Sequence, residues 1–450
     1  MRTSIRFKNQ ALSQLRERLL EDLGNEYFAA LLAKQETVGD LRVLTVMDAR
    51  HPKADAYEGQ GGASLRVSFD SFMRGVLTEI DERLDVDTVI DVHTHPFSKQ
   101  SARFSSIDDA DEREFAKYLE PYGIGYASIV FSQTEYSARW WDADKKGRPR
   151  WETAYVKTQK ASEQIPSSDE RREPDEVGGM FDRSVRALGL EGMRAITAAQ
   201  TVTVVGVGGL GSIIAEHLVH MGFSRIALVD FDRLETANMN RIVGAAFADA
   251  ETGRLKVEAV REHLLSINPD AHVKAIPLDV YDDAVEAVIA DSDWVLLATD
   301  NHASRFHVQE LCFRYFVPFI TAGVNITVDD GRVTDVSGES ILVRMGDRVC
   351  LSCLGRVNFN EIAKERHPDP TVREGLVAKG YVTGGNVKEP AVKTLNAHLA
   401  TIAVDTLVNQ YTERRRDAVV TVYEDNDFPS VYEDTYSTEH RCMDCSVCGF

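Results

Sequence analysis

Two histidines two positions apart, followed by a short polar motif, could bind a metal ion for hydrolysis. The stretch TVIDVHTHP ends in His93-x-His95-Pro96, and FSSIDDADERE follows with Ser105-x-x-Asp108. Alternating apolar residues predict a half-buried strand, on which the two histidines share one face about 6–7 Å apart. Ser105 suits the start of a helix, with Asp108 in its first turn. Two imidazoles and one carboxylate leave a fourth position for water, which is typical of catalytic zinc.

This pattern resembles the JAB/JAMM zinc isopeptidase family, whose signature is a distant glutamate, then His-x-His-Pro, then Ser-x-x-Asp. The resemblance covers roughly residues 10–135. It implies that the two histidines and Asp108 bind zinc. It also implies that Glu26, in GNEYFAALLAKQ, is the general base on the first strand after the first helix. Ser105 would then donate a hydrogen bond to the oxyanion of the attacked amide.

Two alternatives remain open within this first motif set. Glu36 and Glu58 are weaker candidates for the base, and Ser106 with Asp109 is a second Ser-x-x-Asp pair. Nine residues separate His95 from Ser105, where seven is usual in the family, and the second pair would lengthen this gap. We therefore expect Glu26, Ser105 and Asp108 to be the functional residues.

A glycine-rich loop further along the chain predicts a nucleotide site. TVTVVGVGGLGS predicts a strand that enters Gly206-x-Gly208-Gly209-x-Gly211, and a helix follows. Such a turn presents backbone N–H groups to phosphate, and the second strand ends at Asp230, which could bind a ribose. The motif alone does not distinguish NAD from ATP.

Charged and amide side chains around this loop favour ATP over NAD. Asn238 and Arg241 follow the second strand, Lys256 begins a helix, Asp300 ends a third strand, and Arg183 precedes the loop. A nicotinamide enzyme has no need for this set. A triphosphate does, because cations spread its negative charge and a strand-end aspartate can bind Mg²⁺.

Together these motifs resemble the ubiquitin-activating superfamily in its compact ThiF/MoeB form, over about residues 181–450. The resemblance implies that Asp230 binds the ribose, that Asp300 binds Mg²⁺, and that Arg183 reaches the γ-phosphate from the partner subunit of a homodimer. The remaining phosphate-lining residues are Asn238, Arg241 and Lys256. The implied reaction is attack by a C-terminal glycine carboxylate on the α-phosphate, which gives an acyl-adenylate and pyrophosphate.

The cysteines predict a structural zinc site. Cys350-x-x-Cys353 and Cys445-x-x-Cys448 match the paired ligands of a closed Cys₄ site, although Cys442 could pair with Cys445 instead. No cysteine lies between residues 354 and 441, where thioester-forming relatives carry a reactive one. Cys312, in an apolar stretch, is expected in the core. We therefore expect adenylation, and thioester formation on Cys442 stays open.

Length and composition fit two enzyme domains on one chain. The 450 residues allow two or three domains, and a hydrophobic content of 43% predicts a globular, cytoplasmic protein without a transmembrane helix. No secretory signal is recognised at the N-terminus. The formal charge of −20 argues against nucleic-acid binding. The absence of cysteines before residue 312 argues against a disulfide framework.

The elements that would position these residues form two α/β domains. Residues 1–141 predict the JAB/JAMM-like domain, with a helix at about 10–23, and polar residues 142–178 predict a linker. Strands and helices alternate through residues 179–450, which predicts a doubly wound, mostly parallel sheet. The expected strands are 201–205, 225–229, 294–298 and 318–324, and the expected helices are 211–221, 255–265 and 304–316.

The combined hypothesis is a bifunctional enzyme that acts on the C-terminal glycine of a ubiquitin-like protein. One domain would cut after the glycine and the other would adenylate it, in a bacterial ubiquitin-like pathway, with an antiphage role implied only by resemblance. A conjugating enzyme is a further candidate partner. A second hypothesis is an enzyme that activates a sulfur-carrier protein for thiocarboxylate formation. A scaffold with inactive sites and an NAD-dependent oxidoreductase are weaker hypotheses.

Overall fold

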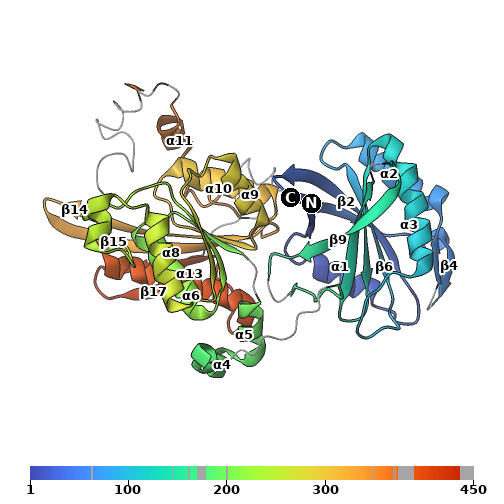
Figure 1. Ribbon diagram of the computed structural model, residues 1–450, viewed down its shortest axis with the longest axis horizontal. Coiled ribbons are helices and arrows are strands. Elements are labelled where there is room, and N and C mark those ends of the chain that lie inside the picture. Colours follow the sequence, from blue (N-terminus) through green and yellow to red (C-terminus); the bar gives the residue numbers. More distant parts are fainter. Residues whose placement is uncertain are drawn as a thin grey trace. The chain divides into compact units, whose positions relative to one another are not determined.

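The computed structural model describes residues 1–61, 64–144, 146–160, 163–169, 179–198, 201–347, 349–367, 369, 371–372, 375 and 390–435. The chain divides into two compact units, Met1–Glu173 and Pro174–Phe450 (Figure 1). Each has its own buried apolar core. Among the described residues, no helix is both long enough and apolar enough to cross a bilayer.

The first unit is built around a closed β-barrel with the strand order β1-β3-β2-β6-β7-β8-β9. Its strands are β1 (Arg2–Arg6), β2 (Phe28–Val38), β3 (Leu41–Arg50), β6 (Thr88–Thr94), β7 (Gly125–Phe131), β8 (Tyr136–Ala143) and β9 (Pro149–Lys157). A separate hairpin pairs β4 (Tyr57–Gly61) with β5 (Ser64–Val67). The helices are α1 (Ala11–Leu19), α2 (Arg74–Glu82) and α3 (Ser106–Leu119).

Apolar faces on both sides of the barrel strands fix where these helices lie. Leu12, Leu15 and Leu19 of α1 enter one buried cluster, together with alternate residues of β2, β6 and β7. Val76 and Ile80 of α2 enter a second cluster on the other side of the same strands. The strand β6, which carries the histidine motif, is thus covered on both faces and lies between β2 and β7.

The predicted linker 142–178 is wrong in its first part, because β9 lies within it. This strand pairs antiparallel with β8 and parallel with β1, and so closes the barrel. Its sequence PRWETAYVK alternates, and Ala154 and Val156 are buried in the core. The charged residues at its start hide this period-two pattern when only composition is considered.

The second unit contains an eight-stranded sheet with the order β12-β11-β10-β13-β14-β15-β16-β17. The five strands from β12 to β14 run parallel and the rest are antiparallel. The strands are β10 (Val202–Val205), β11 (Arg225–Val229), β12 (His272–Ile276), β13 (Trp294–Leu297), β14 (Phe319–Asp329), β15 (Arg332–Val343), β16 (Val420–Glu424) and β17 (Ser430–Glu433).

Helices cover the parallel part of this sheet, as the alternating pattern predicts. Helices α6, α8 and α13 lie together on one face, and α9 and α10 lie together on the other (Figure 1). The helices are α4 (Asp182–Leu188), α5 (Leu190–Thr197), α6 (Gly209–Met221), α7 (Phe247–Thr252), α8 (Lys256–Ile267), α9 (Asp283–Asp291), α10 (His302–Arg314), α11 (Phe359–Glu365) and α13 (Lys393–Thr412).

The strand order of the sheet has a switch point between β10 and β13. Strands β11 and β12 are added on one side of β10. Strands β13 and β14 are added on its other side, so the order in which the chain adds strands reverses there. In open α/β sheets, ligands bind outside the carboxyl ends of the strands at such a switch point. The glycine loop follows β10 and Asp300 follows β13, so both lie at this switch point.

Candidate functional site

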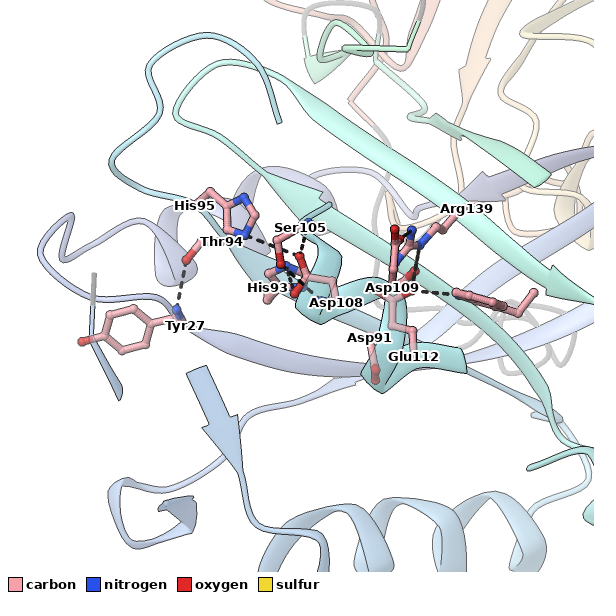
Figure 2. A network of polar contacts seen from close by, with 12 residues as sticks. Tyr27, Asp91, His93, Thr94, His95, Ser105, Asp108, Asp109, Glu112 and Arg139 are labelled. Atoms are coloured by element: carbon pink, nitrogen blue, oxygen red, sulfur yellow. Dashed lines mark hydrogen bonds and ion pairs between the residues drawn. The ribbon is translucent and has the colours of Figure 1, made fainter. Parts of the chain in front are cut away.

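Strand β6 and helix α3 bring His93, His95 and Asp108 together in the first unit. One ligand atom from each residue lies within 4.8 Å of the other two. Nε2 of His93 is 3.6 Å from Oδ1 of Asp108, and Nε2 of His95 is 3.9 Å from Oδ2. Figure 2 shows the three side chains pointing toward one another. This is the only cluster of three or more possible ligands among the described residues.

Ser105 and Asp108 form a capping box that begins α3. The Ser105 backbone N–H donates to Oδ2 of Asp108 at 2.5 Å, and the Asp108 N–H donates to Oγ of Ser105 at 3.2 Å. The cap fixes the direction in which the Asp108 carboxylate points. The Ser105 hydroxyl accepts in this arrangement, so its own proton stays available to a substrate oxygen.

The donor set fits a zinc ion. Nε2 of His93 is buried and has no hydrogen-bond partner among the described residues. Zinc accepts two imidazole nitrogens and one carboxylate oxygen. The candidate ligands would thus be His93, His95 and Asp108, with one position left for water.

Electrostatics keep Asp108 ionised and one imidazole neutral. Burial alone would raise the pKa of Asp108, but the neighbouring His93 ring and the hydrogen bonds with Ser105 hold this pKa well below its usual range. Burial, aided by the charge of His93, lowers the pKa of His95 to about 4. Burial would also lower the pKa of His93, yet the Asp108 carboxylate outweighs it and raises this pKa.

Glu26 lies beside this cluster. It is buried, and it precedes β2 by two residues, so the predicted position on the strand itself is wrong because β2 begins only at Phe28. Its backbone is fixed by the β4–β5 hairpin, since its N–H donates to Gly61 and its carbonyl accepts from Gln60. Burial raises the pKa of Glu26, and the charges of His93 and Asp108 act on it in opposite directions.

The alternative residues lie away from the cluster. Asp109 forms an ion pair with Arg139 at 2.5 Å, and the metal cluster contains Asp108 instead. Glu36 lies on β2 and pairs in register with Val43 of β3, while Glu58 is exposed on β4. Sequence reasoning did not identify Arg139 and its partner Glu112, which form a buried network beside α3 (Figure 2).

The glycines of the second unit divide into packing positions and one open position. Gly206 has φ +87°, and a Cβ there would lie 2.8 Å from the carbonyl oxygen of Ala298. A Cβ on Gly211 would lie 1.8 Å from the oxygen of Gly206, and one on Gly209 would clash with Asn396 and Arg241. A Cβ on Gly208, at the N-cap of α6, would meet nothing within 4 Å. Packing therefore does not require glycine at this position, whereas close approach of a phosphate would.

Asp230 and Lys256 lie at the carboxyl end of the sheet. Asp230 accepts hydrogen bonds from the N–H of Val207 at 2.7 Å and of Asp232 at 2.8 Å, and burial raises its pKa. Lys256 begins α8 and its Nζ lies 2.6 Å from Oδ2 of Asp232. Sequence reasoning did not identify Asp232, whose carboxylate forms an ion pair with this lysine.

The remaining predicted nucleotide-site residues occupy loops and one short helix. Asn238 accepts from the N–H of Glu235, and Arg241 donates to the carbonyl of Ala237 and to Asn240. Asp300 is exposed just after β13. Mg²⁺ is commonly bound by one or two carboxylates together with substrate phosphates, so a single strand-end aspartate fits this ion.

Arg183 and the cysteines meet the prediction only in part. Arg183 is exposed on α4. Cys350 is buried, and the N–H of Cys353 donates to its Sγ at 3.3 Å, so the two residues of the first pair lie close together. Cys442, Cys445 and Cys448 lie outside the described residues. Cys312 is fully buried, as expected.

Comparison with known proteins matches both units. Models of the prokaryotic homologs of the JAB domain and of the ThiF family match residues 8–143 and 181–447. The chain is 30% identical over 213 residues to ubiquitin-like modifier-activating enzyme 5 of Drosophila persimilis, which covers 44% of this chain and 52% of that protein. It therefore spans about half the length of such relatives.

Two further similarities concern the second unit. Molybdopterin-synthase adenylyltransferase of Salmonella typhimurium is 33% identical over 179 residues, which covers 40% of this chain and 67% of that protein. A crystal structure of E. coli MccB with MccA-N7isoASN is 19% identical and covers 60% of this chain and 75% of that chain, at a TM-score of 0.47. The family matches confirm the predicted fold class, a JAB-like domain followed by a ThiF/MoeB-like domain.

Proposed function

The chain belongs to the ThiF family, with a prokaryotic homologue of the JAB domain ahead of it, and on this premise we propose a bifunctional enzyme. It cleaves after the C-terminal glycine of a ubiquitin-like protein and adenylates that glycine with ATP. The observation that carries the proposal is the convergence of His93, His95 and Asp108 within 4.8 Å. An enzyme that only adenylated its partner would have no use for this donor set beside a buried glutamate.

The cleavage step uses residues of the first unit. A zinc ion held by His93, His95 and Asp108 would supply a lowered pKa for its bound water and positive charge to polarise the amide carbonyl. Glu26 accepts the proton of the attacking water and later returns it to the leaving amine, a role that its raised pKa suits. Ser105 donates its hydroxyl proton to the carbonyl oxygen as negative charge develops there.

The adenylation step uses the switch point of the second unit. The glycine carboxylate attacks the α-phosphate of ATP, the bond to the bridging oxygen breaks, and pyrophosphate leaves. The Gly208 loop approaches the phosphates, Asp230 binds the ribose, and Asp300 would hold Mg²⁺. The negative charge of the triphosphate is neutralised by Arg241 and Lys256, and the Asn238 amide lines the phosphates. Arg183 is supplied by the partner subunit of a homodimer.

Placing both reactions on one chain suits a common substrate tail. Both act on the same C-terminal glycine, and tethering raises its effective concentration at the second site. The released glycine carboxylate is the nucleophile that adenylation needs, so the product of one step is the substrate of the other.

Activation of a sulfur carrier is the second candidate. It keeps the acyl-adenylate, but sulfide-level sulfur from a separate donor attacks the acyl carbon, AMP leaves, and a C-terminal thiocarboxylate forms. The absence of cysteine between residues 354 and 441 favours it over thioester formation. It removes the need for a conjugating enzyme.

Two variants separate the two reactions. Glu26→Gln should abolish removal of a C-terminal extension, by about 10²–10⁴-fold, because the general base is lost, while ATP–pyrophosphate exchange on a mature partner continues. Asp300→Ala should do the reverse. Both rates are measured on the full chain with zinc and Mg-ATP. If neither variant altered either rate, the scaffold hypothesis would replace the enzyme.

A further inference from the structure

A buried arginine ties helix α3 to the barrel beside the metal cluster. Arg139 lies on β8 and is only 2% exposed. Its NH1 lies 2.5 Å from Oδ1 of Asp109 and its Nε lies 2.8 Å from Oε2 of Glu112. Both partners belong to α3, so one guanidinium grips two successive turns of the helix that carries Asp108 (Figure 2).

Glu112 joins this arginine to two strands. The same oxygen, Oε2, also accepts a hydrogen bond from Oγ of Ser128 on β7 at 2.5 Å and from Nε1 of Trp141 on β8 at 2.8 Å. Three donors thus converge on one buried carboxylate oxygen. A buried charge is costly unless it is paired and hydrogen-bonded, and here the pairing fixes α3 against the barrel.

The other side of Arg139 reaches the histidines through Phe104. The guanidinium carbon lies 3.7 Å from the Phe104 ring centroid, and that ring is 6.0 Å from the His93 ring. Phe104 also directly precedes Ser105, the N-cap of α3. Arg139 therefore contacts the residue before the cap, the residue after Asp108 and the next turn of the helix.

We propose that Arg139 is a positioning residue of the zinc site, which sets the distance of Asp108 from the two histidines. The proposal rests on the proposed zinc-peptidase function. Zinc–oxygen and zinc–nitrogen bonds are about 2 Å long with little tolerance, so a small slide or rotation of α3 would weaken binding. An apolar side chain could fill the same space but could not fix the helix in register.

Arg42 of the same barrel is a matched control. It is also buried, stacks on the Trp140 ring at 4.3 Å and pairs with Asp142 at 3.0 Å. Its partners belong to β8 and, through Thr3, to β1 rather than to α3. Loss of Arg42 should therefore destabilise the barrel without moving Asp108.

Zinc affinity of the full chain tests the proposal. Affinity is measured by competition with a chromophoric chelator, and the His95→Ala variant subtracts any zinc bound elsewhere. Arg139→Met should weaken the His95-dependent site about tenfold, the lower end of what loss of a direct partner of a metal ligand costs, because Arg139 acts on Asp108 only through α3. Arg42→Met should change it less than about threefold, with folding of each variant checked by circular dichroism.

Each outcome separates the two ideas. If Arg139→Met weakened zinc no more than Arg42→Met, Arg139 would be merely structural and the proposal would be wrong. If the His95→Ala variant bound as much zinc as the wild-type chain, the proposed zinc-peptidase function would itself be wrong, and the positioning role with it. Should Arg139→Met not fold, Arg139→Lys replaces it, since one ammonium cannot grip both carboxylates, and an unchanged affinity there would overturn the proposal.

Discussion

At the scale of single residues, packing explains the glycine at one position of the loop but not at another. Gly208 has open space where a Cβ would stand, although it caps α6 at the loop that we assign to ATP. Gly211, three positions on, has a carbonyl oxygen within 1.8 Å of the same point. Glycine is therefore required at these two positions of one motif for different physical reasons.

Alanine at Gly208 should weaken ATP binding, whereas alanine at Gly211 should lower stability. Gly208→Ala should fold with an almost unchanged melting temperature, but ATP binding should fall at least about tenfold because the methyl group meets the phosphate. Gly211→Ala should destabilise the second unit strongly, since backbone must move. Thermal unfolding and titration calorimetry with Mg-ATP measure both. Equal ATP affinity in wild type and Gly208→Ala would contradict the assignment.

What sequence could predict at this scale depends on separation along the chain. His93, His95 and Asp108 belong to one local motif, so their spacing was enough to predict that they cluster. In the structure Glu26 lies close enough for the charges of His93 and Asp108 to act on its pKa. Arg139 could not be found in this way. The contact of Arg139 with Glu112 spans 27 residues and exists only because β8 packs against α3.

At the scale of elements, the start of α3 serves both folding and chemistry. Ser105 caps the helix and also supplies the hydroxyl proton proposed for the oxyanion. These roles can be separated because glycine replaces a capping serine at a cost of only a few tenths of a kcal/mol, whereas alanine costs about 1 kcal/mol.

Ser105→Ala and Ser105→Gly should therefore differ in stability and agree in rate. Both should slow cleavage by about 10²–10³-fold, as loss of an oxyanion donor does, while only Ser105→Ala should lower the free energy of unfolding by about 1 kcal/mol. Urea denaturation and a cleavage assay on an extended substrate measure these. If the two rates tracked the two stabilities, Ser105 would act through the cap alone.

Strand β9 shows where reasoning about elements from composition fails. Charged residues at positions 148, 150 and 152 indicate a linker, yet Ala154 and Val156, which continue the same alternate positions of the strand, enter the barrel core. Pairing with β1, far away in sequence, decides the outcome. The Rossmann-like strands were predictable because each is a continuous apolar run between helices.

A charge placed inside β9 should expose this role. Val156 is 2% exposed, so Val156→Asp should lower the free energy of unfolding of the first unit by about 3 kcal/mol or more. Arg150→Ala, at an exposed position of the same strand, should cost about 0.5 kcal/mol or less. Urea midpoints compare the two. Similar midpoints would mean that β9 does not close the barrel in solution.

At the scale of the whole molecule, two families of site share one chain. The first unit brings His93, His95 and Asp108 together, and the second has the switch point of its parallel strands between β10 and β13. In our assignment each site is built from described side chains of its own unit, apart from the arginine that a partner subunit supplies. The reactions should therefore be separable by mutation but ordered by chemistry, since cleavage exposes the carboxylate that ATP activates.

The most direct test is the intact mass of a ubiquitin-like protein from the same source, extended beyond its C-terminal glycine. It is incubated with the full chain and zinc, with and without Mg-ATP. We expect loss of the extension without ATP, followed by adenylate formation and pyrophosphate release only when Mg-ATP is present. An extension that stays intact, with pyrophosphate released only from a partner trimmed beforehand, would contradict the bifunctional account.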